Sequence, residues 1–185
     1  MSNNSSNVTY GKPKVGGAVF VAPLGSKLPT DATSTLDASF KCLGYCSDDG
    51  LENEYKIDTD TVKSWGGDVV LNVDKGREDK FTVTLIESIN VEVLKVIYGS
   101  ENVTGTIEAG ISVKANADVL EGNVYVFDMI AKGGILHRIV VPNASLSDLD
   151  KINYKDNDAV GYGATLTAMA DKDGNTHYEY ISKGA

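Results

Sequence analysis

Apolar and polar residues alternate along much of the chain. In KFTVTLIE (residues 80–87) the apolar side chains are separated by Lys80, Thr82 and Thr84. This period of two predicts a half-buried antiparallel strand, with one face toward a core and the other toward solvent. In NVYVFDMIA (residues 123–131) both faces are apolar, which predicts a strand that is covered on both sides.

Further short apolar runs are bounded by glycine, proline, aspartate or serine, which are typical of turns. The additional segments are residues 16–23, 40–47, 68–73, 135–142, 159–170 and 175–182. We expect roughly nine short strands, mostly antiparallel. Asp173-Gly174 predicts that the last two segments form a terminal hairpin, and Lys75-Gly76 is expected to end the segment at 68–73.

The segment INVEVLKVIY (residues 89–98) fits two structures. Its β-branched residues favour a strand, whereas apolar residues recur at helical spacing from Ile89 to Ile97. Asn90 can cap the beginning of a helix, and Gly99 suits the position after its end. We expect a helix here, the only substantial one, and therefore a mainly β fold: an antiparallel β-sandwich or barrel with one flanking α-helix at about 89–98.

The length of 185 residues suits one domain, or one domain with arms. Residues 1–14 are polar and rich in Ser and Asn, so we expect a flexible N-terminal arm followed by a single β domain at residues 15–185. Within that domain, residues 48–67 are expected to form an extended loop or arm. Residues 24–38 and 143–158 also predict long connections, and such segments are usually functional or ordered by a partner.

The formal net charge of −9 at pH 7 limits the possible partners. Binding to nucleic-acid phosphates relies on Lys and Arg that displace counterions, so a conventional DNA- or RNA-binding protein is excluded. An acidic surface that nucleic acid passes without sticking is compatible with this charge. Neither a signal peptide nor an apolar run of membrane-spanning length is recognisable, so we expect no membrane insertion and assembly in the cytosol.

Two cysteines, Cys42 and Cys46, are present. In a strand, residues four apart lie roughly 13 Å from each other, whereas a disulfide needs Cα atoms within about 7 Å. We therefore expect two reduced, partly buried thiols.

The chain offers no recognisable catalytic set. His137 and His177 have no nearby Cys or carboxylate at the spacing of metal ligands, so both are expected to be structural or solvated. The segment DKDGNTHYEYIS resembles the start of a calcium-binding loop, but Thr176 stands where Gly is needed and Ser182 where Glu is needed. We expect no enzyme activity, no catalytic residues, no metal site and no cofactor.

Several long segments, taken in order, resemble the major tail proteins of long-tailed bacteriophages, which are tail tube subunits. They are GGAVFVAPLGSKLPTDATSTLDASFKCLGYCSDDGL, DTDTVKSWGGDVV, FTVTLIESINVEVLKVIYG and RIVVPNASLSDLDKINYKDNDAVGYGATLTA. The likeness runs from about residue 16 to residue 182. The cysteines at 42–46 depart from the aliphatic or small residues expected there.

The resemblance implies a structural virion protein. It implies hexameric rings that stack into a tube, with strands of neighbouring subunits joined into an inner barrel through which DNA passes. The implied partners are other copies of the chain and the tape measure, tail tip and tail terminator proteins, with assembly in the host cytoplasm. Two alternatives remain: a tail terminator or head–tail connector ring, or a monomeric β-sandwich binding module.

Assembly also suggests roles for two groups of residues. The alternation that begins at Tyr55 slips at Val62, just before the only tryptophan. We expect an arm that docks on a neighbour, with a large aromatic anchor and glycines that allow close approach; the alternative is that the tryptophan caps the core. The predicted subunit-interface residues are Tyr55, Ile57, Trp65, Gly66 and Gly67. The predicted channel-lining residues are Lys80, Thr82, Thr84, Thr165 and Thr167.

Overall fold

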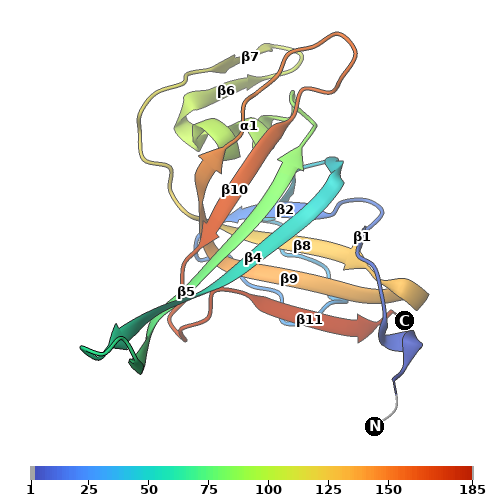
Figure 1. The fold of residues 1–185 in the computed structure, drawn as a ribbon. Helices are drawn as coiled ribbons and strands as arrows, with labels where there is room; N and C mark the ends of the chain where they lie inside the picture. Colours follow the sequence, from blue (N-terminus) through green and yellow to red (C-terminus); the bar gives the residue numbers. More distant parts are fainter. Residues whose placement is uncertain (1–2, 185) are drawn as a thin grey trace.

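The computed structural model describes residues 3–184 and is mainly antiparallel β, with one α-helix (Figure 1). The strands are β1 (Lys12–Pro13), β2 (Val19–Pro23), β3 (Lys41–Cys42), β4 (Cys46–Lys63), β5 (Val69–Leu85), β6 (Val103–Thr106), β7 (Gly110–Val113), β8 (Asn123–Ile130), β9 (Ile135–Leu149), β10 (Tyr162–Ala168) and β11 (Tyr178–Lys183). The helix α1 spans Val91–Tyr98, and short 3-10 turns lie at Ser5–Asn7, Ser100–Asn102 and Lys132–Gly134.

One nine-stranded sheet has the order β3-β2-β8-β9-β10-β5-β4, and in addition β1 pairs with β8 and β11 with β9. Strands β6 and β7 form a separate two-stranded sheet beside α1 (Figure 1). The long strand β9 serves two layers, because its first half lies between β8 and β11 and its second half pairs with β10. The sheet bends there, so that β4, β5 and β10 cross β8, β9 and β11 (Figure 1).

The two layers enclose the main core. Phe81 of β5 stacks on Phe127 of β8, with ring centroids 5.5 Å apart. The predicted sandwich is confirmed, and the sheet is not closed into a barrel, because β3 and β4 stand at its two ends. Strand β8 is covered on both faces as predicted: Tyr125 and Phe127 enter the main core, while Val124 and Val126 enter a second cluster.

The predicted helix is also confirmed. The side chain of Asn90 accepts a hydrogen bond from the Glu92 N–H at 3.0 Å, and the Gly99 N–H donates to the Lys95 carbonyl. Four apolar residues of α1 are buried in the main core, including Val93, which is 0% exposed. Burial of this stripe outweighs the strand preference of its β-branched residues.

Several strand predictions are wrong. Residues 40–47 are divided between β3 and the start of β4, and β9 runs to Leu149, into the connection predicted at 143–158. Residues 68–73 and 80–87 belong to one strand, β5, because Lys75-Gly76 makes a bulge rather than a break. The last two strands form no hairpin: β10 lies between β9 and β5, whereas β11 pairs with the first half of β9. The turn near Gly174 instead carries the chain from one layer to the other, and β11 packs Tyr178 and Tyr180 against the second cluster.

A buried ion pair joins the 24–38 loop to this second layer. Arg138 is 1% exposed, and its Nε and Nη2 donate to both carboxylate oxygens of Asp128 at 2.6 and 2.8 Å. Its Nη1 donates to the backbone carbonyls of Asp31 and Ser34. The guanidinium, which belongs to β9, therefore has partners on β8 and on the loop, which suits its planar set of donors.

The two cysteines are free and half-buried, as predicted. Burial raises the pKa of the Cys46 thiol to about 11, which keeps it protonated and unreactive at neutral pH.

Candidate assembly site

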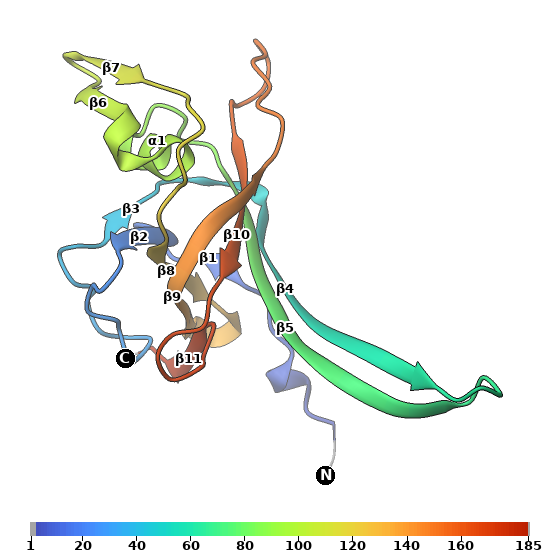
Figure 2. The ribbon, with the colours of Figure 1, turned by 90° about the vertical axis from the view of Figure 1, so that its left-hand side faces the viewer.

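A long hairpin formed by β4 and β5 leaves the body of the molecule (Figure 2). Near the body its inward residues are core residues, as Phe81 and Val83 are 0% and 3% exposed. Farther out, from Tyr55 on β4 and Glu78 on β5, all residues up to the turn are exposed. We call residues 55–78 the arm. The range 48–67 thus lies in one strand of this hairpin and in its turn.

Bulges redirect the side chains of the arm. Asp58 pairs with Gly76 and Thr59 with Asp74, so Lys75 has no partner across the hairpin. The φ of Gly76 is 122°, a conformation that a side chain disfavours. Because a bulge exchanges the two faces of a strand, the residues of β5 beyond it switch sides. Leu71 and Val73 therefore lie on the same face of the hairpin as Val62, which pairs with Leu71.

The outer part of the arm consequently presents apolar residues to solvent. Val62, Leu71 and Val73 are 48%, 55% and 40% exposed and share one face of the hairpin. Contiguous exposed apolar side chains are typical of interaction surfaces.

The tryptophan lies in the turn at the far end of the arm. The Ser64 N–H donates to the Asp68 carbonyl at 2.8 Å, and the Gly67 N–H donates back to the Ser64 carbonyl at 2.9 Å. Gly67 has a φ of 94°, which a glycine adopts without strain. Trp65 is fully exposed and does not cap the core of its own subunit. The turn therefore presents the largest side chain in the chain to solvent.

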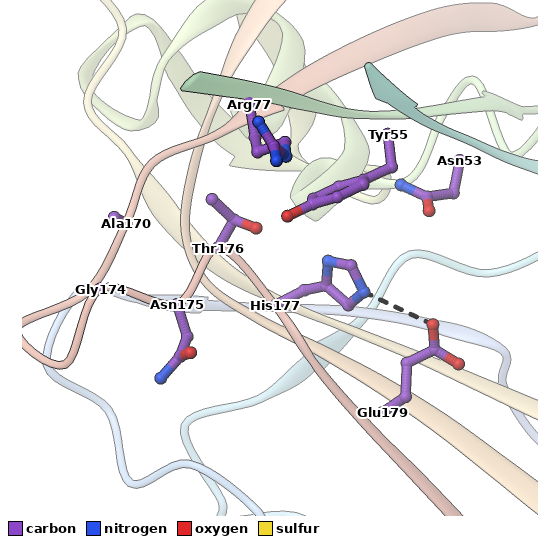
Figure 3. A pocket seen from close by; sticks show the side chains of 9 residues that line it. All are labelled: Asn53, Tyr55, Arg77, Ala170, Gly174, Asn175, Thr176, His177 and Glu179. Carbon is purple, nitrogen blue, oxygen red and sulfur yellow. Dashed lines mark ion pairs between the residues drawn. The ribbon is translucent and has the colours of Figure 1, made fainter. Parts of the chain in front are cut away.

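The root of the arm is held by a buried carboxylate. Asp79 is 1% exposed and accepts hydrogen bonds from Asn53 Nδ2 at 2.7 Å, Thr176 Oγ1 at 2.6 Å and His177 Nδ1 at 2.5 Å. His177 is thus structural, and its Nε2 lies 3.4 Å from a Glu179 oxygen (Figure 3). These bonds join β5, β4 and the segment before β11.

The role of Asp79 was not among the predictions, although the alternation of side chains in β5 points to it. Asp79 continues the alternation of Phe81 and Val83 and therefore occupies a core-facing position. A carboxylate at such a position needs hydrogen-bond donors, because an unpaired buried charge is costly. Two of the three donors, Thr176 and His177, are almost a hundred positions away, so the sequence pattern could not identify them.

A hollow of about 660 Å³ lies between the arm and the body at this root (Figure 3). The ring of Tyr55 forms part of its wall, edge-on to His177 with centroids 6.2 Å apart. Arg77 lies on the same face of the hairpin as Tyr55 and pairs with Asp74 at 2.6 Å, which lowers the pKa of that carboxyl. The lining residues are Asn53, Tyr55, Arg77, Ala170, Gly174, Asn175, Thr176, His177 and Glu179.

The residues expected to line a channel lie together on another surface. Thr165 pairs with Thr82, their Oγ1 atoms being 3.0 Å apart, and Thr167 pairs with Lys80. They occupy the face of β5 and β10 that points away from the core, where Thr84 also lies. We call this surface the polar sheet face.

The polar sheet face is flanked by acidic residues. Glu52 and Glu54 of β4 are exposed directly opposite Thr82 and Lys80. Lys80 donates a hydrogen bond to Glu78, which lowers the pKa of the Glu78 carboxyl. Lys80, the one basic residue among the five expected channel-lining residues, is thus paired with a carboxylate.

Two unpaired strand edges border the polar sheet face. The strands in this layer follow the order β9 (residues 145–149), β10, β5 and β4. Within residues 3–184, β4 has β5 as its only strand partner, and residues 145–149 of β9 have only β10. Open edges of this length are templates for pairing with another chain.

Comparisons with known proteins place the chain in a family. The family model described as "Phage tail tube protein" matches residues 1–185, and no curated protein matches the chain. Across the described residues, no helix is long and apolar enough to cross a membrane. The match spans the whole sequence and agrees with the resemblance of the ordered segments. The chain therefore belongs to the phage tail tube protein family and is a structural protein of the virion tail.

Proposed function

We propose that this protein forms hexameric rings that stack into the tail tube and enclose the channel through which DNA enters the host. The observation that carries this proposal is the layer with a polar outward face and an open edge on each side. A single copy leaves both edges unpaired, whereas a ring of copies pairs them all. Ring formation thus removes the aggregation hazard that the isolated subunit carries.

The strand directions support such a ring. Each neighbouring pair among β9, β10, β5 and β4 is antiparallel, so β4 runs opposite to β9. When β4 of one copy lies beside residues 145–149 of the next, the new pair is again antiparallel. The contact uses two different surfaces of the chain, and a rotation that closes such a head-to-tail contact generates a ring.

The polar sheet face supplies the channel wall in this proposal. Its threonines are uncharged, and its neighbours Glu52 and Glu54 are acidic. A cationic wall would hold DNA through phosphate contacts, whereas this surface lets it pass. Tape measure, tail tip and tail terminator proteins would meet the tube at its core and ends, and assembly would take place in the host cytoplasm.

The arm is the part proposed to join subunits beyond the ring. It is anchored at its root by Asp79 and exposes Trp65, Leu71 and Val73. Tyr55, Ile57 and the two glycines of the turn would complete this contact. Large aromatic side chains carry much of the binding energy of protein interfaces.

The test combines negative-stain electron microscopy with labelling. Purified protein, alone or with tail-tip components, is expected to form rings or tubes; rings that never stack would favour a terminator or connector. In tubes of a Lys80→Cys variant with Cys42→Ser and Cys46→Ser, a small maleimide should react while a maleimide on a long polymer should not. The unassembled variant, which reacts with both reagents, is the control. Equal labelling of tubes by both would place Lys80 on the outside and refute the channel assignment.

A further inference from the structure

We infer that the hollow at the root of the arm receives Trp65 of a second copy of the chain. This inference rests on the proposed tube. The hollow lies on the core-facing side of the hairpin, opposite the polar sheet face. It is therefore separate from the strand edges that form the proposed ring contact. The contact would connect the tip of one arm to the root of another.

The walls of the hollow suit an indole ring. Tyr55 is 52% exposed and presents an aromatic ring, and the Arg77 guanidinium stands beside it on the same face. Aromatic rings and guanidinium groups both stack favourably on indole. Ala170 and Gly174 leave space on the other side. A volume of about 660 Å³ lies within the range of roughly 300–1,000 Å³ typical of ligand sites.

The hollow also has an acceptor for the indole N–H. The carboxylate of Glu179 lines it and is 42% exposed. A buried tryptophan usually donates its N–H to such a partner. The Tyr55 ring and the Arg77 guanidinium match the indole face, and the carboxylate matches its N–H.

Hydrogen bonds hold the walls in place before anything binds. The three donors of Asp79 fix the root of the arm against Thr176 and His177. On the opposite wall, Asp171 accepts hydrogen bonds from the Tyr178 hydroxyl at 2.6 Å and from the Asn175 N–H at 3.0 Å. A preformed site loses little entropy when it is filled, which favours binding.

The tryptophan cannot reach the hollow of its own subunit. Tyr55 and Trp65 are ten residues apart on a paired hairpin, a separation of about 30 Å at the usual rise of a strand. The ladder of hydrogen bonds prevents the tip from folding back. The occupant must therefore come from another copy, and a head-to-tail contact that does not close on itself propagates a filament. This is the geometry that stacked rings need.

Cross-linking tests the contact while keeping the tryptophan. In a chain with Cys42→Ser and Cys46→Ser, the pair Gly66→Cys and Ala170→Cys places one thiol beside Trp65 and one in the hollow. Gly66 has no positive φ and its Cβ position is open apart from a distant Ser64 oxygen, so the change is tolerated. Oxidised tubes should give a ladder of covalent multimers. The matched control replaces Ala170→Cys by Ala117→Cys in the exposed segment 114–119 and should give none.

Fluorescence gives a second readout, because Trp65 is the only tryptophan. On assembly its emission should shift to shorter wavelength, and quenching by acrylamide should fall several-fold. Ala170→Phe, which places a ring inside the hollow, should block tubes and leave the emission unchanged, whereas Ala117→Phe should assemble normally. Tubes without a ladder above the control, or with Trp65 still fully quenched, would overturn this inference alone. Failure of the unaltered chain to form any ring or tube would instead overturn the proposed function.

Discussion

The body and the arm have the same local structure but differ in how far their apolar side chains are buried. Both consist of antiparallel strands with alternating side chains, and both contain valines and leucines. In the body, Val126 and Val140 are 0% exposed, while in the arm Val70 and Leu71 are 63% and 55% exposed. The body buries its apolar residues within one subunit. The arm leaves them exposed to solvent, as expected of a segment that packs against a partner.

The change from buried to exposed side chains occurs within a single strand. Along β5, Phe81 and Val83 face the opposite layer, whereas Arg77 and the residues before it extend past its edge. Asp79 stands at the boundary and replaces apolar packing by hydrogen bonds to the other layer. The extent of the second layer, and not the alternation of the strand, therefore determines which residues become core.

The largest expected effect lies in the body. Arg138→Met leaves the Asp128 carboxylate buried without its guanidinium, which should lower the free energy of unfolding by about 3–5 kcal/mol. Urea unfolding followed by circular dichroism measures this loss. Combining Arg138→Met with Asp128→Leu removes both charges and should recover much of it. A single variant within about 0.5 kcal/mol of the unaltered chain would show that this pair is not what stabilises the body.

An intermediate effect is expected at the boundary. Asp79→Leu removes the common acceptor of Asn53, Thr176 and His177, and a hydrogen bond to a charged group contributes about 1.5–3 kcal/mol. Hydrogen exchange should increase at the amides of β4 and β5 near the root and remain unchanged in β8. Asp60→Leu, at an exposed site of the same hairpin, serves as the control. Unchanged exchange at the root would mean that packing alone fixes the arm.

The smallest effect on stability is expected in the arm, and one strand offers a matched pair. Val83→Ala should cost roughly 1–3 kcal/mol, because Val83 is 3% exposed. Val73→Ala, ten residues earlier in β5 and 40% exposed, should change the free energy of unfolding by less than about 0.5 kcal/mol. The same Val73 variant should weaken tube assembly, as measured by sedimentation. Equal stability losses at the two valines would erase the distinction between body and arm.

Local patterns predicted much of the fold. The alternation around Phe81, the two apolar faces of residues 123–131 and the capped helix predicted at about 89–98 depend on neighbouring residues alone. All three are confirmed, with the helix beginning at Val91. Strand pairing was less predictable. Asp173-Gly174 does form a turn. The partner of β11 is nevertheless β9, because Tyr178 and Tyr180 pack against the second cluster. A turn sequence predicts that the chain reverses direction, but it does not predict which layer the next strand joins.

The sequence by itself determined the periodicities, the acidic charge, the position of the tryptophan beside two glycines and the resemblance to tail tube proteins. Only the tertiary structure decided that Trp65 stands at the end of a paired arm, that Asp79 joins three segments and that the channel-facing candidates share one surface. Each of these depends on contacts between residues distant in the chain. Such contacts arise from the global fit of the layers, because burial and hydrogen bonding are satisfied for the whole molecule rather than residue by residue.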